Sequence, residues 1–257
     1  MKGYIVDAFT DEIFKGNPAA VFVMDKWPSD ELMQKIAIEN NLSETAFTVK
    51  NGKKYKLRWF TPGGEIDLCG HATLATGFIL LNYYEIELNQ ITFETMSGEL
   101  AVTKKNDLYE MNFPSYELKK VPVTEEMEDS IGTQIKEAYL GRDLLCVVDS
   151  PATVSNLKLN FDSMVKLDGL LMNVTARGNK YDCVSRSFAP KLDIQEDPVC
   201  GSGHCHIVPY WAKRLDKKDI VAYQDSERTG ILYCRYEGDR TYLSGHAVLY
   251  SITKVFI

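Results

Sequence analysis

The first half of the chain alternates short apolar runs with polar turns, a pattern typical of β-strands. These predicted strands cover residues 3–8, 19–23, 45–49, 56–60, 90–94, 99–103 and 108–113. Two stretches have helical patterns instead. A helix that begins at Ser29 carries its apolar residues on one face, and residues 70–81 are apolar nearly all round. Because a helix without a polar face belongs inside a core, the pattern predicts a strand-rich layer around one buried helix.

The second half repeats this mixture after a polar segment, residues 115–128, that we interpret as a linker. A polar helical segment is expected within residues 124–137, and a short helix at residues 161–167. A long helix is expected over residues 200–215, bent or broken at Pro209. Strands are predicted at residues 143–148, 170–175, 181–188, 219–224, 230–236, 241–249 and 252–257. Each half therefore combines many strands with one long helix.

One motif occurs twice. Residues 58–71 run from Arg-Trp-Phe-Thr-Pro to a Cys-Gly pair, and residues 186–204 run from Arg-Ser-Phe-Ala-Pro to a second Cys-Gly pair. The two arginines are 128 residues apart in a chain of 257, and three extra residues precede the second Cys-Gly. The alignment pairs Glu65 with Asp193 and places Asp197 within the extra residues. A repeat at half length predicts two similar domains.

The expected fold is therefore α+β, with two pseudo-symmetric domains that each wrap strands around a central helix. We place them at residues 1–117 and 118–257, with the last strand as a candidate to return to the first half. A pseudo-twofold axis would bring the two Cys-Gly corners face to face across a cleft.

Composition narrows the function classes. The chain is 45% hydrophobic and 25% charged, as in ordinary globular proteins. Its net charge is -7 and it has no basic run, so neither nucleic acid nor an acidic membrane is an expected partner. The N-terminus lacks a signal sequence, and residues 72–81 are too short to cross a bilayer. Six scattered cysteines indicate reduced thiols and a cytoplasmic protein.

Each Cys-Gly corner directly precedes a helix, where unpaired backbone N–H groups offer a place for a carboxylate. Gly70 and Gly201 let the backbone approach a ligand, and a cysteine at a helix start has its pKa lowered toward neutrality. His71 and Ser202 follow directly and can donate hydrogen bonds. Asp197 is a candidate because it lies among the extra residues.

Structural roles stay open for the same side chains. Cysteine is often a small buried hydrophobe, and a histidine at this position can cap its helix. Asp197, which precedes a proline, can serve a turn, and Ser202 can act as an N-cap. Arg58 and Arg186 are candidates for buried ion pairs.

A crowded set of metal-ligand types follows the second corner. It consists of Cys200, His204, Cys205 and His206. Their spacing does not match paired zinc patterns, so no metal is expected. The residues alone also contain no phosphate loop and no familiar hydrolase motif.

Five motifs follow one another along nearly the whole chain, at residues 7–10, 16–21, 42–47, 67–73 and 196–203. Together they resemble the phenazine-biosynthesis PhzF-like isomerases. The resemblance implies the fold of diaminopimelate epimerase, in which each domain is a barrel-like layer around a helix and the active site lies between the domains. It also implies a homodimer and an isomerase that needs no cofactor.

The resemblance singles out Glu44 as the catalytic acid/base. A carboxylate in a mostly apolar site can take a proton and return it near neutral pH. Asn17 lies where related epimerases use an asparagine to contact substrate. The substrate-binding positions implied by the family are His71, Asp197, Ser202, Gly70 and Gly201.

The leading hypothesis is a cofactor-independent isomerase that moves a proton at carbon of a small carboxylated metabolite. Cys69 and Cys200 match the two thiols of diaminopimelate epimerase, which the phenazine enzyme itself lacks. A two-thiol racemase or epimerase of amino-acid type is therefore the alternative. A third hypothesis is a non-catalytic protein that binds a small molecule or a partner.

Overall fold

The computed structural model describes residues 1–256. Ile257, the last residue of the second predicted domain and of the predicted strand 252–257, lies outside this range. The chain divides into two compact units, Met1–Asn112 with Ser244–Ile257, and Phe113–Leu243. None of the helices within the described range is long and apolar enough to span a membrane.

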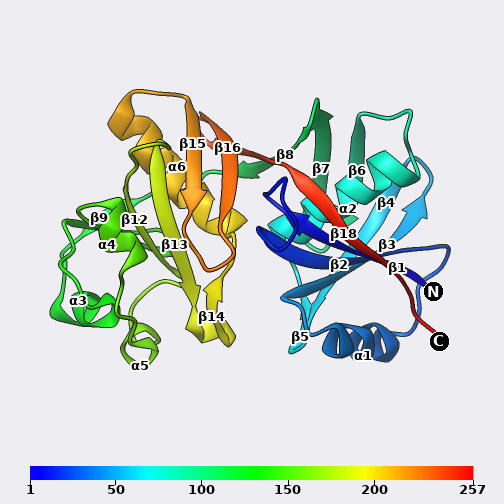
Figure 1. The fold of residues 1–257 in the computed structure, drawn as a ribbon, viewed down its shortest axis with the longest axis horizontal. Coiled ribbons are helices and arrows are strands. Elements are labelled where there is room, and N and C mark those ends of the chain that lie inside the picture. Colours follow the sequence, from blue (N-terminus) through cyan, green and yellow to red (C-terminus); the bar gives the residue numbers. More distant parts are fainter. Residues whose placement is uncertain (257) are drawn as a thin grey trace. The chain divides into compact units, whose positions relative to one another are not determined.

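The first unit is built on one curved run of strands (Figure 1). Its strands are β1 (Lys2–Ala8), β2 (Asn17–Met24), β3 (Glu44–Asn51), β4 (Lys54–Thr61), β5 (Gly64–Ile66), β6 (Gln90–Thr95), β7 (Gly98–Lys105), β8 (Leu108–Pro114) and β18 (Ala247–Lys254). Neighbours pair in the order β18, β1, β2, β3, β4, β6, β7, β8, and β5 pairs with β4. The pairs β2–β3 and β4–β6 are parallel, because α1 (Asp30–Asn40) and α2 (Gly70–Tyr83) connect their strands.

Helix α2 forms the core of this unit. It packs against β1, β2, β3, β6, β7 and β18, and nearly all of its residues are buried, as its uniformly apolar sequence predicts. Gly77 permits the close approach to β7, since a Cβ at this position would lie 2.5 Å from Cγ1 of Val102. Helix α1 begins at the predicted cap, where the Ser29 side chain accepts a hydrogen bond from the Leu32 N–H.

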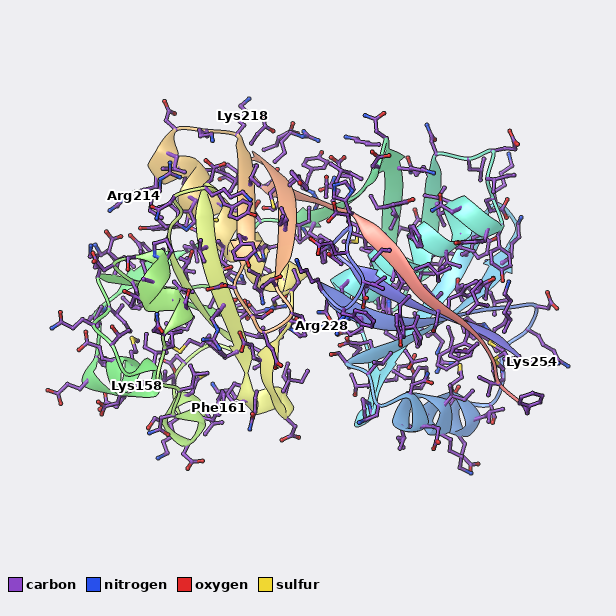
Figure 2. All side chains as sticks on the ribbon, in the orientation of Figure 1. Lys158, Phe161, Arg214, Lys218, Arg228 and Lys254 are labelled. Carbon is purple, nitrogen blue, oxygen red and sulfur yellow. The ribbon has the colours of Figure 1, made fainter. Side chains whose placement is uncertain are left out.

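The second unit has a corresponding strand order. Its strands are β9 (Lys119–Val121), β10 (Glu137–Leu140), β11 (Leu144–Val147), β12 (Met172–Arg177), β13 (Cys183–Ala189), β14 (Ile194–Asp197), β15 (Asp219–Gln224), β16 (Gly230–Glu237) and β17 (Arg240–Gly245). Its helices are α3 (Glu125–Ile131), α4 (Pro151–Ser155), α5 (Phe161–Met164) and α6 (Gly201–Leu215), with a 3-10 turn η1 (Pro190–Leu192). Helix α6 packs against β12, β15 and β16, and its last turn is polar, with Arg214 exposed (Figure 2).

The predicted repeat is visible in the pairing pattern. The run β1–β2–β3–β4–β6–β7 is antiparallel, parallel, antiparallel, parallel, antiparallel, and β10–β11–β12–β13–β15–β16 has the same alternation. Helices α2 and α6 occupy equivalent places in the two runs. The predicted α+β class, with strands around a central helix in each half, is confirmed.

Three interpretations of the sequence were wrong. Residues 115–128, interpreted as a linker, contain β9, which pairs with β10, and the start of α3. The polar helix expected to reach residue 137 ends at Ile131, because Gly132 takes a left-handed conformation with φ 66° and terminates it. Glu137 begins strand β10 instead. Near the C-terminus, the break falls at His246, whose carbonyl accepts a hydrogen bond from the Phe9 N–H, and not between residues 249 and 252.

Pro209 does not break α6, which is continuous over Gly201–Leu215, while the other expected outcome, a bend, stays a prediction. A proline inside a helix leaves the carbonyl four residues earlier without its usual donor. Here that carbonyl belongs to Cys205, and it accepts a hydrogen bond of 3.1 Å from the Tyr116 N–H. The Tyr116 ring also stacks on His206 at 4.3 Å. The proline thus frees an acceptor that attaches the segment before β9 to the helix.

Candidate functional site

Glu44 is the first residue of β3 and lies beside Ala19 of β2. The sequence alone predicts an exposed acidic residue at this position, between a helix and a strand. Its side chain is only 9% exposed. A carboxylate is rarely buried to this degree without a partner, so the structure makes Glu44 a candidate independently of the family resemblance.

The partner is His71, in the first turn of α2. Its Nε2 lies 2.9 Å from Oε2 of Glu44, and both side chains are more than 90% buried. On the other side of the ring, Nδ1 lies 3.6 Å from Sγ of Cys69, the N-cap residue of α2. The fold therefore brings together three predicted residues, a carboxylate, an imidazole and a thiol, at one end of the central helix.

The charges in this group are coupled. Burial alone lowers the pKa of His71, but the adjacent Cys69 sulfur and Glu44 carboxylate outweigh burial and raise that pKa well above its ordinary value. Burial, reinforced by Glu44, raises the pKa of the Cys69 thiol to about 11, although His71 opposes the shift. The Cys69 thiol is therefore protonated near neutral pH, and the contact of His71 with the Glu44 carboxyl group joins the other two side chains.

This result corrects the expectation that the helix start would lower the pKa of both cysteines. In the second unit, burial and the neighbouring Asp197 raise the pKa of Cys200 well above its ordinary value, despite hydrogen bonds from Ser202 and Gly203. Both thiols are buried, so the cost of removing a thiolate from water exceeds what the helix end contributes.

Asn17 begins β2 and is fully buried, two positions before the Ala19 that pairs with Glu44. Gly70 is the first residue of α2, and Gly201 the first residue of α6. Substrate contact by Asn17, Gly70 and Gly201 stays a prediction.

The second corner has a different set of contacts. Cys200 caps α6 by accepting a hydrogen bond from the Gly203 N–H at its sulfur, and its own N–H donates to Oε1 of Gln224 at 2.8 Å. The hydroxyl of Ser202 lies 3.5 Å from the Cys200 sulfur. An Asp197 carboxylate oxygen accepts from the Val199 N–H at 3.1 Å, which is a turn contact. Sequence reasoning missed Gln224, which sits far from the motif.

The alignment of the two corners also needs correction. Arg58 makes a two-pronged ion pair with Glu65, at 2.6 and 2.7 Å, and Arg186 makes the same pair with Glu196, at 2.8 and 2.7 Å. The counterpart of Glu65 is thus Glu196 and not Asp193. The extra residues form the turn that contains η1, and Asp197 occupies the position of Ile66.

The crowded cysteine and histidine set after the second corner does not converge. The ring Nδ1 of His204 contacts the Cys200 carbonyl at 2.7 Å, and Nδ1 of His206 contacts the Ser202 carbonyl at 3.2 Å. The Cys205 thiol donates to the Gly201 carbonyl. Since consecutive helical residues point about 100° apart, these groups bond separately along α6.

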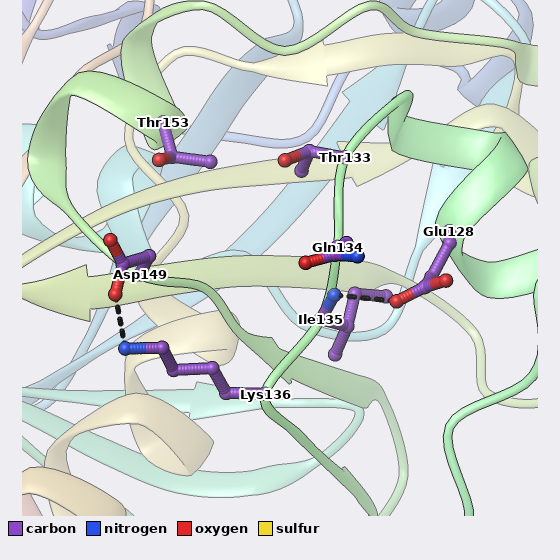
Figure 3. A pocket seen from close by; sticks show the side chains of 7 residues that line it. All are labelled: Glu128, Thr133, Gln134, Ile135, Lys136, Asp149 and Thr153. Carbon is purple, nitrogen blue, oxygen red and sulfur yellow. Dashed lines mark hydrogen bonds and ion pairs between the residues drawn. The ribbon is translucent and has the colours of Figure 1, made fainter.

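A surface pocket of about 580 Å³ lies elsewhere in the second unit (Figure 3). Its lining includes the ion pair of Lys136 with Asp149 and the hydrogen bond from the Ile135 N–H to Glu128. Its charged side chains are thus already paired, and it contains none of the predicted functional residues.

Comparison with known proteins identifies the family of this chain. The family model for phenazine biosynthesis-like proteins, PhzC-PhzF, matches residues 6–252. An uncharacterized isomerase of Pseudomonas aeruginosa is 43% identical over 251 residues, which cover 97% of this chain and 96% of that protein. A PhzF family structure from Enterococcus faecalis is 51% identical with a TM-score of 0.98, over 100% of this chain and 99% of that one.

A more distant structure bears on the fold alone. A hydroxyproline epimerase from Agrobacterium vitis has a TM-score of 0.67 at 11% identity, covering 99% of this chain and 90% of that one. The fold, with strands around a central helix in each unit, is therefore shared with that structure.

Proposed function

Because the chain belongs to the phenazine biosynthesis-like (PhzC-PhzF) family, we propose that it is an isomerase that moves a proton at carbon of a small carboxylated metabolite. Glu44 is the general acid/base in this proposal, and no cofactor takes part. The carboxylate removes a proton from one carbon and returns it to another carbon of the same substrate.

One observation carries the proposal: the buried ion pair of Glu44 with His71. A general base needs a fixed position and a proton partner close by, and burial within the unit supplies both. The imidazole ring of His71, with Nε2 2.9 Å from Oε2 of Glu44, fixes the position of the carboxylate before substrate arrives. It can then donate a hydrogen bond to a polar group of the substrate as charge develops.

The two-thiol alternative receives less support. A racemase of that type needs one thiolate at rest, and burial raises the pKa of both Cys69 and Cys200. The contact of Cys69 with His71 is the one feature in its favour, because an imidazole can accept the thiol proton.

The experiment is proton NMR in D₂O, with a panel of amino acids, hydroxy acids and dihydroaromatic carboxylates. Glu44→Gln keeps the size of the side chain and removes its basicity, so deuterium incorporation should fall by about 10²- to 10⁴-fold. Glu39→Gln, the same change at an exposed position of α1, is the matched control. The double variant Cys69→Ala/Cys200→Ala should retain exchange.

Each other outcome favours a different function. Exchange that is lost in the cysteine double variant and kept in Glu44→Gln would move the protein to the thiol epimerases. A compound that raises the melting temperature without any exchange would identify a binding protein, since a ligand stabilises the folded state that binds it.

Several family-derived expectations stay predictions. They are substrate contacts by Asn17, Gly70, His71, Asp197, Gly201 and Ser202, and assembly as a homodimer. Sedimentation velocity on the purified chain measures the assembly directly, and substrate KM of the single variants measures the contacts.

A further inference from the structure

Of the three side chains Glu44, Cys69 and His71, the proposed proton transfer gives no role to Cys69. Cys69 is buried, protonated at neutral pH and in contact with His71 through its sulfur. A cysteine that only fills space in the core needs no imidazole beside it, so the contact of Cys69 with His71 suggests a chemical role.

The three side chains form a compact set of metal-ligand types. Among residues 1–256, Glu44, Cys69 and His71 are the group whose ligand atoms all lie within 4.8 Å of one another. Thiolate, imidazole and carboxylate are the three donors that zinc takes in proteins, and three protein ligands with one open position are typical of its accessible sites.

The spacing fits such an ion. With Zn–S about 2.3 Å and Zn–N about 2.0 to 2.1 Å, two ligands on a tetrahedral ion lie roughly 3.5 to 3.6 Å apart. The distance from Sγ of Cys69 to Nδ1 of His71 is 3.6 Å. The separation of these two atoms thus matches that of two ligands on one ion, while the Glu44 carboxylate, which lies at Nε2 on the opposite side of the ring, must reorient to become the third ligand.

We infer that Glu44, Cys69 and His71 form a zinc-binding site, which takes one Zn²⁺ reversibly with Sγ, Nδ1 and a carboxylate oxygen as ligands. This differs from the sequence-based expectation that no metal binds. Binding releases the thiol proton and the imidazolium proton to solvent, and nothing is oxidised or reduced. Two negative ligands then balance the charge of the ion, which offsets its unfavourable position near the positive end of α2.

The equivalent corner of the second unit supplies the contrast. Cys200 and Cys69 are the N-cap residues of α6 and α2, but the Cys200 sulfur accepts a hydrogen bond from its helix and the Cys69 sulfur does not, and Ser202 stands in place of His71. The registers β3–β4 and β12–β13 place Leu171 at the position of Glu44. The second corner thus keeps the cysteine and lacks both other ligands, which makes Cys200→Ala a matched control.

The test uses the full-length chain, freed of metal with a chelator and titrated with Co²⁺, a spectroscopic substitute for Zn²⁺. Wild type and Cys200→Ala should both develop a thiolate-to-cobalt charge-transfer band and visible bands of tetrahedral intensity, saturating at one equivalent. Zn²⁺ should then remove the bands by displacement. Cys69→Ala should lose the charge-transfer band and bind at least about tenfold more weakly.

A second readout protects the test against misfolding. Zn²⁺ should raise the melting temperature of wild type and of Cys200→Ala, and not that of Cys69→Ala, because only a native site stabilises the fold. Absence of a charge-transfer band in wild type overturns the inference, and so does a band of equal strength in Cys69→Ala.

Metal binding is measured without substrate, so its outcome is separate from that of the proposed function. One consequence does rest on that function: a bound ion occupies Glu44 and His71, so Zn²⁺ should inhibit deuterium exchange in competition with substrate.

Discussion

The two Cys-Gly corners have the same backbone plan and different chemistry. Around Cys69 the fold places Glu44 and His71, both buried and paired at 2.9 Å. Around Cys200 the equivalent positions hold Ser202 and Leu171, and Leu171 packs with Cys200 and Ala189 in a small apolar cluster. The first corner therefore holds a carboxylate and a histidine out of water beside its cysteine, while the same two positions at the second corner hold an apolar and a hydroxyl side chain.

This difference distinguishes the residues that both units share to build the corner from those that only the first unit has. Both units need the strand–turn–helix corner to connect two parallel strands, so the Cys-Gly pair and the Arg–Glu pair recur in each. Burying a carboxylate is costly, and the pair of a carboxylate with a histidine directly beside the cysteine occurs at only one of the two corners. The corner that keeps it is the one where chemistry is to be sought.

The largest effect is expected when the first corner is converted into the second. The double variant Glu44→Leu/His71→Ser copies Leu171 and Ser202, so the corner should still fold. Deuterium exchange with an identified substrate should fall by about 10²- to 10⁴-fold or more, because the proposed acid/base group is gone. NMR measures the exchange and circular dichroism checks the fold; a well-folded variant with undiminished exchange contradicts the assignment.

The reverse change should cost stability. Leu171→Glu puts a carboxyl group into the apolar cluster beside Cys200 without a histidine to pair with it. The expected loss in the free energy of unfolding is about 3 to 5 kcal/mol, greater at high pH where the carboxyl must ionise. Urea denaturation measures it, with Leu171→Met as a control of similar volume that should cost less than about 1.5 kcal/mol.

The two buried histidines beside the corners should make stability depend on pH in opposite directions. Burial lowers the pKa of His204 to about 4, so the unfolded chain binds the extra proton more readily. Stability should fall by up to about 3 kcal/mol as the pH drops from about 6.5 toward 4. The pKa of His71 is raised in the folded chain, so its contribution is complete below about pH 6.5 and is lost as the pH rises through the folded value.

The repeat provides a control for the predicted loss of stability at acid pH. Thr73 occupies the position of His204 in the first unit, and its hydroxyl donates to the Cys69 carbonyl as His204 contacts the Cys200 carbonyl. His204→Thr should therefore reduce the fall in the free energy of unfolding at acid pH, as measured by urea denaturation. His71→Asn should reduce the fall at alkaline pH. An unchanged pH dependence in both variants would disprove the assignment.

The smallest effect concerns the shared ion pair. Lysine cannot reproduce the two-pronged contact of arginine, so Arg58→Lys and Arg186→Lys should each reduce the free energy of unfolding by about 1 kcal/mol or less. Arg186 should lose more, because its side chain is 14% exposed and that of Arg58 is 24% exposed. Chemical denaturation of both variants tests the order, and equal or reversed losses would contradict it.

Much of the fold was predictable because its signals are local. Apolar runs bounded by turn residues located most strands, the uniformly apolar stretch identified α2, and Ser29 marked the start of α1. The failures also have local causes that were underweighted, such as the left-handed Gly132 that ends α3. The break predicted at Pro209 is absent for a tertiary reason, because the Tyr116 N–H donates a hydrogen bond to the carbonyl that the proline leaves without its usual donor.

The candidate site was predictable only in part. His71 and the two cysteines stood out because they belong to a repeated motif, whereas Glu44 needed the family resemblance. Glu44 and His71 are 27 residues apart, and no pattern in the sequence around either residue predicts their contact. The misplaced alignment of Asp197 shows the same limit, because strand pairing, and not sequence similarity, decides which residues are equivalent.

The sequence by itself determined the repeat, the two helix starts with their Cys-Gly corners, and the kinds of side chain available at each. Periodicity, caps and turns act over a few residues, so they can be read along the chain. Only the tertiary structure decided that Glu44 is buried against His71, that burial raises the pKa of both thiols, and that the corners differ. Burial and charge pairing depend on which strands lie beside which helix, and that is a property of the folded chain.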